Sequence, residues 1–411
     1  MIKEYDIGRF DGELDEFGNK INGTFYYNNG DTFKGEWVND KIVYGTYTYA
    51  NGEIYVGAYE NGMRNGIGIF YFNDGDNYNG EWLNGLRNGK GTYIWVNGAY
   101  YEGEYKKGKR HGKGTMHYVN GDVYDGDWIS DDRHGKGTYT QATGEQLIGT
   151  FKKDKFSGKG VYTKPNGSRY EGGWKDNKMH GKGTYEWANG DVYTGYYING
   201  QRNGKGTYKK ANGEIYVGHF MNGMRNGKGV FKRSNGDVYK GYYKDDKRHG
   251  KGTLIIANGE KYVGEFVENV ICGKGKIAYS NGLKYTGEFQ NGKPNGKGVS
   301  TWPDGQINKG SFKDGLPHGF GECVFAGGVK YRGEWNEGKM EGYGTIWFTN
   351  GNQYSGTFLN DKMHGKGIFF FNDGDKYDGE FKNGLRHGYG KYEKLNGECI
   401  SGKWENDKFI N

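Results

Sequence analysis

The chain has 411 residues, of which 80 are Gly and 17% are aromatic, and its formal net charge is +7. It contains no run of 18 apolar residues, and residues 1–9 include four charged side chains, which argues against a transmembrane helix and a secretory signal peptide. Its three cysteines, Cys272, Cys323 and Cys399, lie far apart without metal-ligand spacing, which favours a reducing compartment. We therefore expect a cytoplasmic protein, in which Cys323 is a small buried apolar residue.

One 23-residue pattern repeats through the chain, most clearly at residues 101–123, YEGEYKKGKRHGKGTMHYVNGDV. If Tyr101 is repeat position 0, position 2 is Gly in all 18 occurrences, position 0 is aromatic in 15 and position 4 is aromatic in 17. A fixed period of this kind is typical of a repeat array. It predicts a lead-in over residues 1–9, a continuous array of 17 repeats and a closing half-repeat over residues 10–404, and a C-terminal tail over residues 405–411.

Each repeat is expected to form two short antiparallel strands, because Tyr101 and Tyr105 alternate with polar residues and so share one face. For all aromatic residues to lie on the same face, the loop within a repeat must be even and the loop between repeats odd. A four-residue loop within the repeat would place Tyr105 opposite Gly114, so that rings lie over glycines. Residues 119–121 fit a three-residue turn between repeats, with Gly121 in the left-handed conformation.

Stacking these hairpins predicts an all-β fold, an elongated single-layer antiparallel β-sheet of about 17 hairpins. At roughly 4.8 Å per strand the sheet would extend on the order of 160 Å. A single hairpin is only marginally stable in water, so each repeat depends on its neighbours to cover its aromatic face.

The pattern YxGEWxxGxxxGxGxxxxxxG resembles the MORN (membrane occupation and recognition nexus) repeat over essentially the whole chain. The resemblance implies a single-layer antiparallel sheet of stacked hairpins that serves as an assembly or membrane-associated module. In the enzymes that contain such repeats another domain performs the chemistry, and the repeat array here leaves no room for one. The resemblance therefore implies a protein that is not an enzyme.

Several features that suggest a catalytic or metal site fit the repeat better. Seven of the nine His share position 10, but equivalent positions in successive repeats should lie roughly 9.5 Å apart, too far to converge on a metal. The Gly-Lys at residues 112–113 is followed by Gly rather than by Ser or Thr, so it is not a phosphate-binding loop. Turns rich in Asp, such as residues 372–375, lack the final Glu of a calcium loop. We expect no catalytic residues, no metal and no cofactor.

The charge is unevenly distributed. Residues 1–146 hold 15 Lys and Arg against 22 Asp and Glu, residues 147–261 hold 23 against 10, and residues 262–411 hold 19 against 18. The odd loop places position 12 opposite position 3 of the next repeat, and in the flanking repeats a Lys there faces an acid, as Lys113 faces Asp127. In five consecutive repeats the acid is absent. The lysines of these repeats, the candidate anion-binding or partner-binding residues, are Lys136, Lys159, Lys182, Lys205 and Lys228.

The two end strands of the sheet are expected to expose unpaired backbone groups, which can pair with another chain. Acidic residues near the start would blunt the first edge, whereas the last strand carries Ile400, Gly402 and Trp404 and is the candidate for self-association. We therefore expect a dimer formed through the C-terminal end.

These observations favour a non-enzymatic structural scaffold that organises protein partners in a cytoskeletal or ciliary assembly, for example one like the radial spoke of an axoneme. The alternative is a peripheral membrane module whose lysines bind anionic phospholipid headgroups such as phosphoinositides, located at the cell cortex. Nucleic-acid binding ranks lower, because the aromatic residues cover glycines on the face opposite the lysines and offer no stacking platform. The lysines also remain open to a simpler interpretation, a solvated charge row that keeps the protein soluble.

Overall fold

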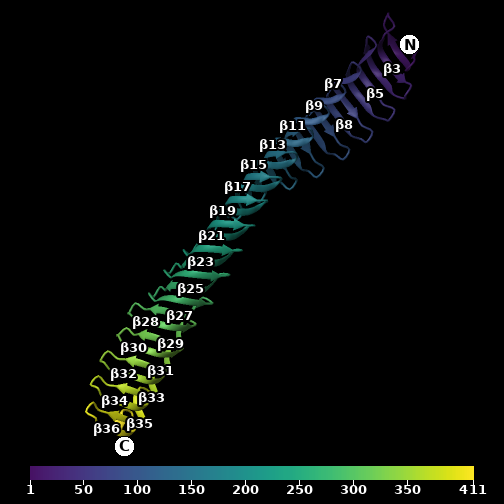
Figure 1. The fold of residues 1–411 in the computed structure, drawn as a ribbon. Helices are drawn as coiled ribbons and strands as arrows, with labels where there is room; N and C mark the ends of the chain where they lie inside the picture. Colours follow the sequence, from purple (N-terminus) through teal and green to yellow (C-terminus); the bar gives the residue numbers. More distant parts are fainter. The chain divides into compact units, whose positions relative to one another are not determined.

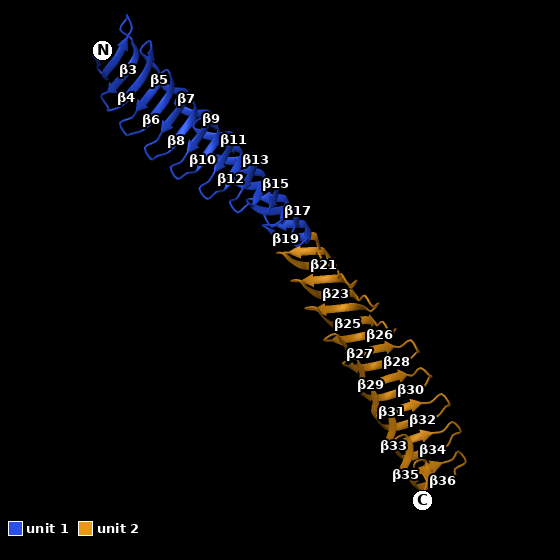
Figure 2. Cartoon of the chain, turned by 180° about the vertical axis from the view of Figure 1, so that it is seen from behind, with its two compact units in different colours: residues 1–204 blue, residues 205–411 orange.

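The computed structural model describes all 411 residues and contains β-strands and turns but no helix. None of its elements is therefore a helix that could cross a membrane. The chain divides into two compact units, residues 1–204 and 205–411 (Figure 2). Each unit is a stack of antiparallel strands that follow one another in chain order (Figure 1). The predicted all-β hairpin architecture is confirmed.

In unit 1 every strand from β2 to β18 pairs antiparallel with the strand before it. The strands are β1 (Ile2–Tyr5), β2 (Gly8–Leu14), β3 (Lys20–Tyr27), β4 (Thr32–Val38), β5 (Lys41–Thr48), β6 (Ile54–Glu60), β7 (Met63–Tyr71), β8 (Asn77–Leu83), β9 (Leu86–Ile94), β10 (Tyr100–Lys106), β11 (Lys109–His117), β12 (Val123–Ile129), β13 (Asp132–Thr140), β14 (Gln146–Lys152), β15 (Lys155–Thr163), β16 (Arg169–Lys175), β17 (Lys178–Glu186) and β18 (Val192–Ile198).

Strand β19 (Gln201–Lys209) contains the boundary between the units. In unit 2 every strand from β21 to β37 pairs antiparallel with the strand before it. The strands are β20 (Ile215–Met221), β21 (Met224–Lys232), β22 (Val238–Lys244), β23 (Lys247–Ile255), β24 (Lys261–Val267), β25 (Val270–Ala278), β26 (Lys284–Gln290), β27 (Lys293–Thr301), β28 (Ile307–Lys313), β29 (Leu316–Val324), β30 (Lys330–Asn336), β31 (Lys339–Trp347), β32 (Gln353–Leu359), β33 (Lys362–Phe370), β34 (Lys376–Lys382), β35 (Leu385–Glu393), β36 (Cys399–Glu405) and β37 (Lys408–Phe409).

The turn between repeats has the predicted three residues. After β11, the N–H of Tyr118 donates to the carbonyl oxygen of Asp122 at 2.9 Å, which closes the loop over residues 119–121. Gly121 has a φ of +87°, a left-handed conformation that is open to Gly at no steric cost. The Asn120 side chain accepts the N–H of Asp122 at 3.1 Å, which explains the preference for Asn or Asp before this Gly.

The register within a repeat differs from the prediction. Gly103, and not Tyr105, pairs with Gly114, because the turn contains two residues rather than four. A bulge over residues 111–113 then adds two residues to the second strand. Gly112 in this bulge has a φ of +67°, which accounts for the Gly at that position. Side-chain parity alone could not detect the bulge, because two extra residues leave every side chain on its predicted face.

One face of each unit is an aromatic layer in which the position-0 ring covers the glycine pair of its own hairpin. A Cβ added to Gly103 would lie 2.5 Å from both the Gly114 Cα and the Tyr101 hydroxyl, so only Gly leaves room for the ring. The Tyr101 hydroxyl donates to the Glu104 carbonyl oxygen at 3.1 Å, and the side chain is fully buried. Trp128 stands edge-on between Tyr101 and Tyr124, with ring centroids 5.3 and 5.2 Å away.

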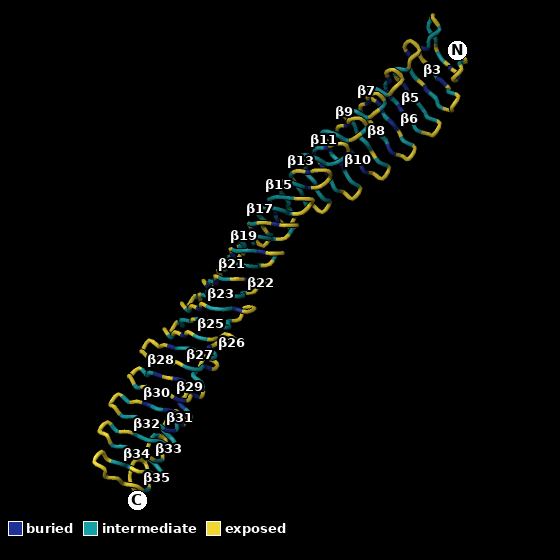
Figure 3. Tube along the Cα trace, in the orientation of Figure 1, coloured by how far each residue is buried: buried dark blue, intermediate teal, exposed yellow.

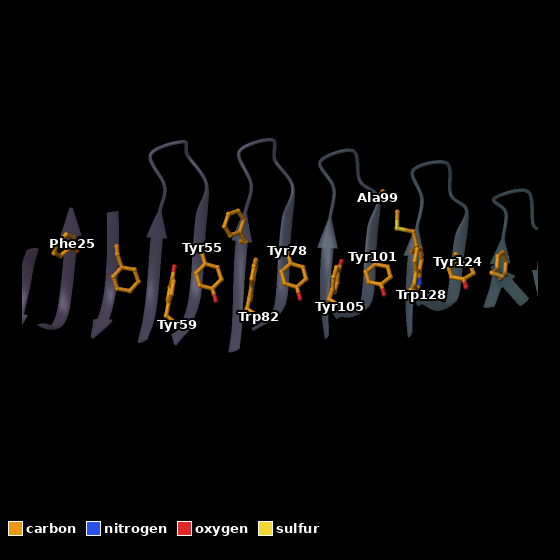
Figure 4. Packing of buried hydrophobic residues seen from close by; sticks show 14 of the residues in the cluster. Phe25, Tyr55, Tyr59, Tyr78, Trp82, Ala99, Tyr101, Tyr105, Tyr124 and Trp128 are labelled. Carbon is orange, nitrogen blue, oxygen red and sulfur yellow. The ribbon is translucent and has the colours of Figure 1, made fainter. Parts of the chain in front are cut away.

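Face-on and edge-on rings alternate along the cluster that Figure 4 shows, and most buried residues lie within the strands, whereas the turns are mostly exposed (Figure 3). Each T-shaped contact adds roughly 0.5–1.5 kcal/mol to the burial of its rings. Because each ring touches rings from neighbouring hairpins, the layer joins hairpins that would be marginal alone.

Both ends of the chain add strands beyond the predicted array. Residues 2–5 form β1, which pairs with β2 and covers the first repeat. The tail folds back as β37, where Phe409 pairs with Trp404 and the N–H of Ile410 donates to the Lys403 carbonyl oxygen at 2.9 Å. The predicted lead-in and tail are therefore part of the sheet. The tail packs back onto the last repeat because the apolar ring of Phe409 contacts Trp404, with the two ring centroids 5.4 Å apart.

Candidate functional site

The five predicted lysines all lie on the polar face at repeat position 12, and all five are exposed. We refer to them together as the lysine row. In unit 1, Lys136, Lys159 and Lys182 occupy β13, β15 and β17. In unit 2, Lys205 lies in β19 and Lys228 in β21. Within unit 1 successive members are two strands apart, which corresponds to roughly 9.5 Å.

The predicted pairing across repeats is confirmed for the members whose register the structure defines. Opposite Lys136 is Thr150, opposite Lys159 is Gly173, and opposite Lys182 is Tyr196. In unit 2 Lys228 faces Tyr242. No carboxylate stands opposite these four lysines.

The acid-containing pairs of the flanking repeats are also in the predicted register, but most of them are not ion pairs. Lys113 and Asp127 approach to 2.5 Å between Nζ and Oδ1, and this contact raises the pKa of Lys113. The other four pairs face each other without an ion pair. Exposed ion pairs contribute only about 0–1 kcal/mol to stability. Charge pairing between repeats therefore does not explain why position 3 is an acid in these repeats.

The position-3 acid has a second role, which sequence reasoning missed: it covers the bulge of its own hairpin. Asp127 Oδ2 accepts the backbone N–H of Lys136 at 2.8 Å, and Glu81 Oε1 accepts that of Lys90 at 2.8 Å. Glu104 makes the same bond to Lys113 at 3.3 Å. The acid therefore satisfies a backbone donor that the bulge removes from the ladder. The signal was present in the sequence as an acid followed eight residues later by Gly and nine residues later by Lys, but its meaning depends on the bulge.

In residues 147–261, where basic residues predominate, position 3 is not an acid and no carboxylate covers the bulge. The loss is most complete at Gly173. Position 3 is Gly there, so no side chain reaches the bulge at Gly181, where an added Cβ would meet nothing within 4 Å. No side chain accepts the N–H of Lys182, and Lys159 stands directly opposite Gly173. We call this place, formed by Gly173, Gly181 and Lys182 beside Lys159, the open bulge. A backbone donor beside a positive-φ Gly, in a place where two exposed lysines stand on the two strands that flank β16, is chemically suited to an anion.

Two row lysines have tyrosine neighbours where the flanking repeats have acids. The Lys182 Nζ lies 5.5 Å from the ring centroid of Tyr196, and the Lys228 Nζ lies 5.4 Å from that of Tyr242. A cation–π contact holds the ammonium without neutralising its charge. The positive charge of these lysines thus remains available to an external anion.

The position-10 His residues lie in the bulges or directly beside them, as His111 and His134 do, and no group of three or more His, Cys, Asp or Glu side chains gathers where it could hold a metal ion. Cys323 is buried, and burial raises the pKa of its thiol to about 12, so it is the small core residue that was predicted.

The predicted self-association strand is only partly open. Ile400 is 42% exposed, but Trp404 is buried, and residues 409–411 lie against Gly402 and Lys403. The prediction of a free edge is therefore wrong at Gly402 and Trp404, because the tail supplies the pairing partner. Association of the chain with itself stays a prediction.

A family model described as the MORN repeat matches sixteen segments, and two of its gaps fall on Leu147 and Asn308, position-0 residues that are not aromatic. The matched residues are 33–54, 55–77, 78–100, 101–123, 124–146, 148–169, 170–192, 193–215, 216–238, 239–261, 262–284, 285–307, 309–330, 331–353, 354–376 and 377–399.

Known structures resemble the chain only weakly. The SAS-4 (dCPAP) TCP domain of Drosophila melanogaster, in complex with a proline-rich motif of Ana2 (dSTIL), is 16% identical, covers 36% of this chain and 81% of its own, and has a TM-score of 0.24. The TCP10 domain of Danio rerio CPAP, in complex with a peptide of STIL, is 12% identical, covers 65% of this chain and 98% of its own, and has a TM-score of 0.23. Similarity at this level does not establish a shared function. No curated protein matches the chain.

Proposed function

This chain belongs to the MORN repeat family, and from that premise we propose that it is a non-enzymatic scaffold that organises protein partners in a cytoskeletal or ciliary assembly. The observation that carries the proposal is the lysine row, whose members in unit 1 recur in successive repeats without an opposing acid. A regular series of cations with no acid opposite them can bind an acidic segment at several points. The cytoskeletal setting follows from the kinds of assembly in which the family is used.

The spacing of the row suggests the conformation of such a segment. Lysines two strands apart repeat at roughly 9.5 Å. A polyproline II helix has three residues per turn and rises about 3.1 Å per residue, so every third residue recurs after roughly 9.3 Å. An acidic segment with carboxylates at every third position would therefore present one to each lysine of unit 1. Acidic tails such as those of tubulin are the partner chemistry that we propose.

The open bulge supports a second candidate function, the binding of anionic phospholipid headgroups. It combines the uncovered N–H of Lys182 with the ammonium groups of Lys159 and Lys182, a set of donors that suits a phosphate. In this case the protein would associate with the membrane surface at the cell cortex through electrostatic attraction.

The test compares two variants that remove the same charge from the same repeat position. In the first, all five row lysines become Ala; in the second, five lysines that face an acid become Ala. Binding of the full-length protein to polymerised tubulin and to vesicles containing phosphoinositides is then measured by co-sedimentation at low and high salt. The matched control lysines are Lys90, Lys113, Lys251, Lys274 and Lys366.

We expect the native protein and the control variant to bind tubulin, and the row variant to lose binding, with a steep decrease as salt is raised. Binding to the vesicles alone, lost in the row variant, would favour the membrane function instead. Equal loss in both variants would show that only net charge matters, and unchanged binding in the row variant would leave these lysines as a solubility feature; either result contradicts the proposed role of the row.

A further inference from the structure

One repeat in unit 2 lacks the ring that covers its glycine pair. Position 0 of this repeat is Asn308, which pairs with Ser300 on one side and with Cys323 on the other. In unit 1, around the repeat that begins at Tyr124, the same three positions hold Met116, Tyr124 and Tyr139. Three adjacent small side chains thus replace three large ones in the aromatic layer.

The loss of the ring leaves a hollow in the aromatic layer. Elsewhere the position-4 ring touches two position-0 rings, as Phe289 touches Tyr262 and Tyr285. Phe312 touches Tyr285 at 5.0 Å but has no ring at position 308, and Trp335 likewise touches only Tyr331. A cavity of about 560 Å³ opens here. Its walls include Tyr285, Phe312, Trp335, Met340 and Pro317.

A polar atom in the wall of this cavity has no partner. Asn308 is only 7% exposed, and its Nδ2 donates to Ser300 Oγ at 3.3 Å, but its Oδ1 accepts no hydrogen bond. An unsatisfied buried polar atom costs roughly 1–3 kcal/mol. In the neighbouring repeats, the hydroxyls of Tyr285 and Tyr331 donate to the position-3 carbonyl oxygens at 3.1 and 2.8 Å. The Asn308 Oδ1 is itself buried, so a phenol that enters this hollow would supply the missing donor as the amide turns toward the cavity.

The hollow also lacks the arginine that lies against the rings in several other repeats. In unit 1 the Arg110 guanidinium lies 4.3 Å from the Trp128 ring centroid, and its Nε donates to Asp131 at 3.4 Å. At the hollow, Met340 takes the place of this Arg, so Asp361 accepts only the Met340 N–H, at 2.8 Å. The cavity is lined by two acids, Asp304 and Asp361, and by no Lys, Arg or His.

We propose that this hollow is a docking site for a partner protein, which inserts a tyrosine side chain beside Asn308 and places an arginine against Asp361. The tyrosine takes the position that a ring of the chain itself occupies in the complete repeats. The arginine supplies the charge that Met340 does not. Tyrosine and arginine are also the residues that most often dominate the energy of protein interfaces. The site lies on the aromatic face, so it is independent of the lysine row.

The test uses blocked peptides in which a tyrosine and an arginine are separated by zero to three glycines. Binding to the full-length protein is followed by saturation-transfer NMR from protein to peptide and is quantified by titration. Matched peptides replace the tyrosine by Ala or the arginine by Glu. Two variants alter the site, Asn308→Tyr, which fills the hollow, and Met340→Arg, which gives Asp361 its guanidinium. Lys309→Ala, on the opposite, exposed face of the same strand, is the control.

We expect saturation transfer to the tyrosine ring, and an affinity at least about tenfold weaker in Asn308→Tyr but unchanged in Lys309→Ala. Asn308→Tyr restores the residue of the complete repeat, so it should fold, which circular dichroism would verify. Met340→Arg should weaken only the peptide that contains Arg. Equal binding of the Ala-substituted peptide, unchanged binding by Asn308→Tyr, or no binding of any peptide would overturn the proposal.

Discussion

The repeat at residues 101–123 and the repeat at residues 308–330 have the same backbone but different interiors. Gly310 pairs with Gly321 just as Gly103 pairs with Gly114, and the bulge follows in both hairpins. Only the first has its own position-0 ring over the glycine pair; in the second, the nearest ring is that of Trp335, which lies beside Gly321. The comparison shows that the glycines, the turns and the neighbouring strands determine the hairpin, whereas the ring stabilises it and can be replaced. A repeat can therefore contain a cavity in place of part of its core and still keep its strand pairing in the sheet.

Removing the ring tests this comparison with the largest expected effect. Tyr101→Ala should lower the free energy of local opening by about 3–5 kcal/mol, because it removes a fully buried aromatic ring. Asn308→Ala should cost less than about 1 kcal/mol or stabilise the hairpin, because no ring is lost there and the unsatisfied Oδ1 is removed with the side chain. Hydrogen exchange of amides in each hairpin is the appropriate measurement, since repeat arrays open locally. Equal losses at both positions would contradict the comparison.

Adding a methyl group to the glycine pair should have a smaller effect, again unequal between the two repeats. A Cβ on Gly114 would overlap the Tyr101 ring, whereas a Cβ on Gly321 would lie 3.2 Å from the Lys309 carbonyl oxygen and 3.4 Å from Trp335. We expect Gly114→Ala to cost about 1–3 kcal/mol and Gly321→Ala less than about 1 kcal/mol.

A double variant sharpens this prediction. Combining Gly114→Ala with Tyr101→Ala should cost less than the sum of the two single variants, because the overlap disappears with the ring. Strict additivity of the measured unfolding free energies would show that the glycine is required by the backbone alone.

The smallest expected effect concerns pH. The Tyr139 hydroxyl donates to the Asp122 carboxylate, and this bond is the main reason that the pKa of Asp122 lies below its usual value. Asp122 Oδ1 also accepts the Ala142 N–H at 2.9 Å. Because the folded pKa is lowered, the stabilisation is present above the pKa of the unfolded chain and is lost as the pH falls through the folded pKa.

The protection of the Ala142 amide against hydrogen exchange, corrected for the intrinsic rate, should therefore decrease at acidic pH. In the repeats around the hollow, Gln306 stands in the place of Asp122, so the corresponding Ala326 amide should show no such decrease. Asp122→Asn should abolish the pH dependence of protection at the Ala142 amide. A decrease of equal size at both amides would indicate a general acid effect and not this carboxylate.

The sequence by itself determined the period, the two strands of each repeat, the faces on which the side chains lie and the three-residue turn before Asp122. It also determined that Lys159 and Lys182 face no acid. These conclusions depend on parity and on local turn chemistry, which involve residues close together in the chain.

Tertiary structure alone decided the bulge at residues 111–113, the use of Asp127 to cover such a bulge, the return of the tail onto Trp404 and the hollow at Asn308. A bulge of two residues leaves the side-chain pattern unchanged, so no periodicity reveals it. The hollow depends on three small residues on three consecutive strands, which become neighbours only when those strands pair. Whether a missing ring leaves a cavity or is filled by a neighbour is decided by the packing of the surrounding rings, which the order of residues along one repeat does not contain.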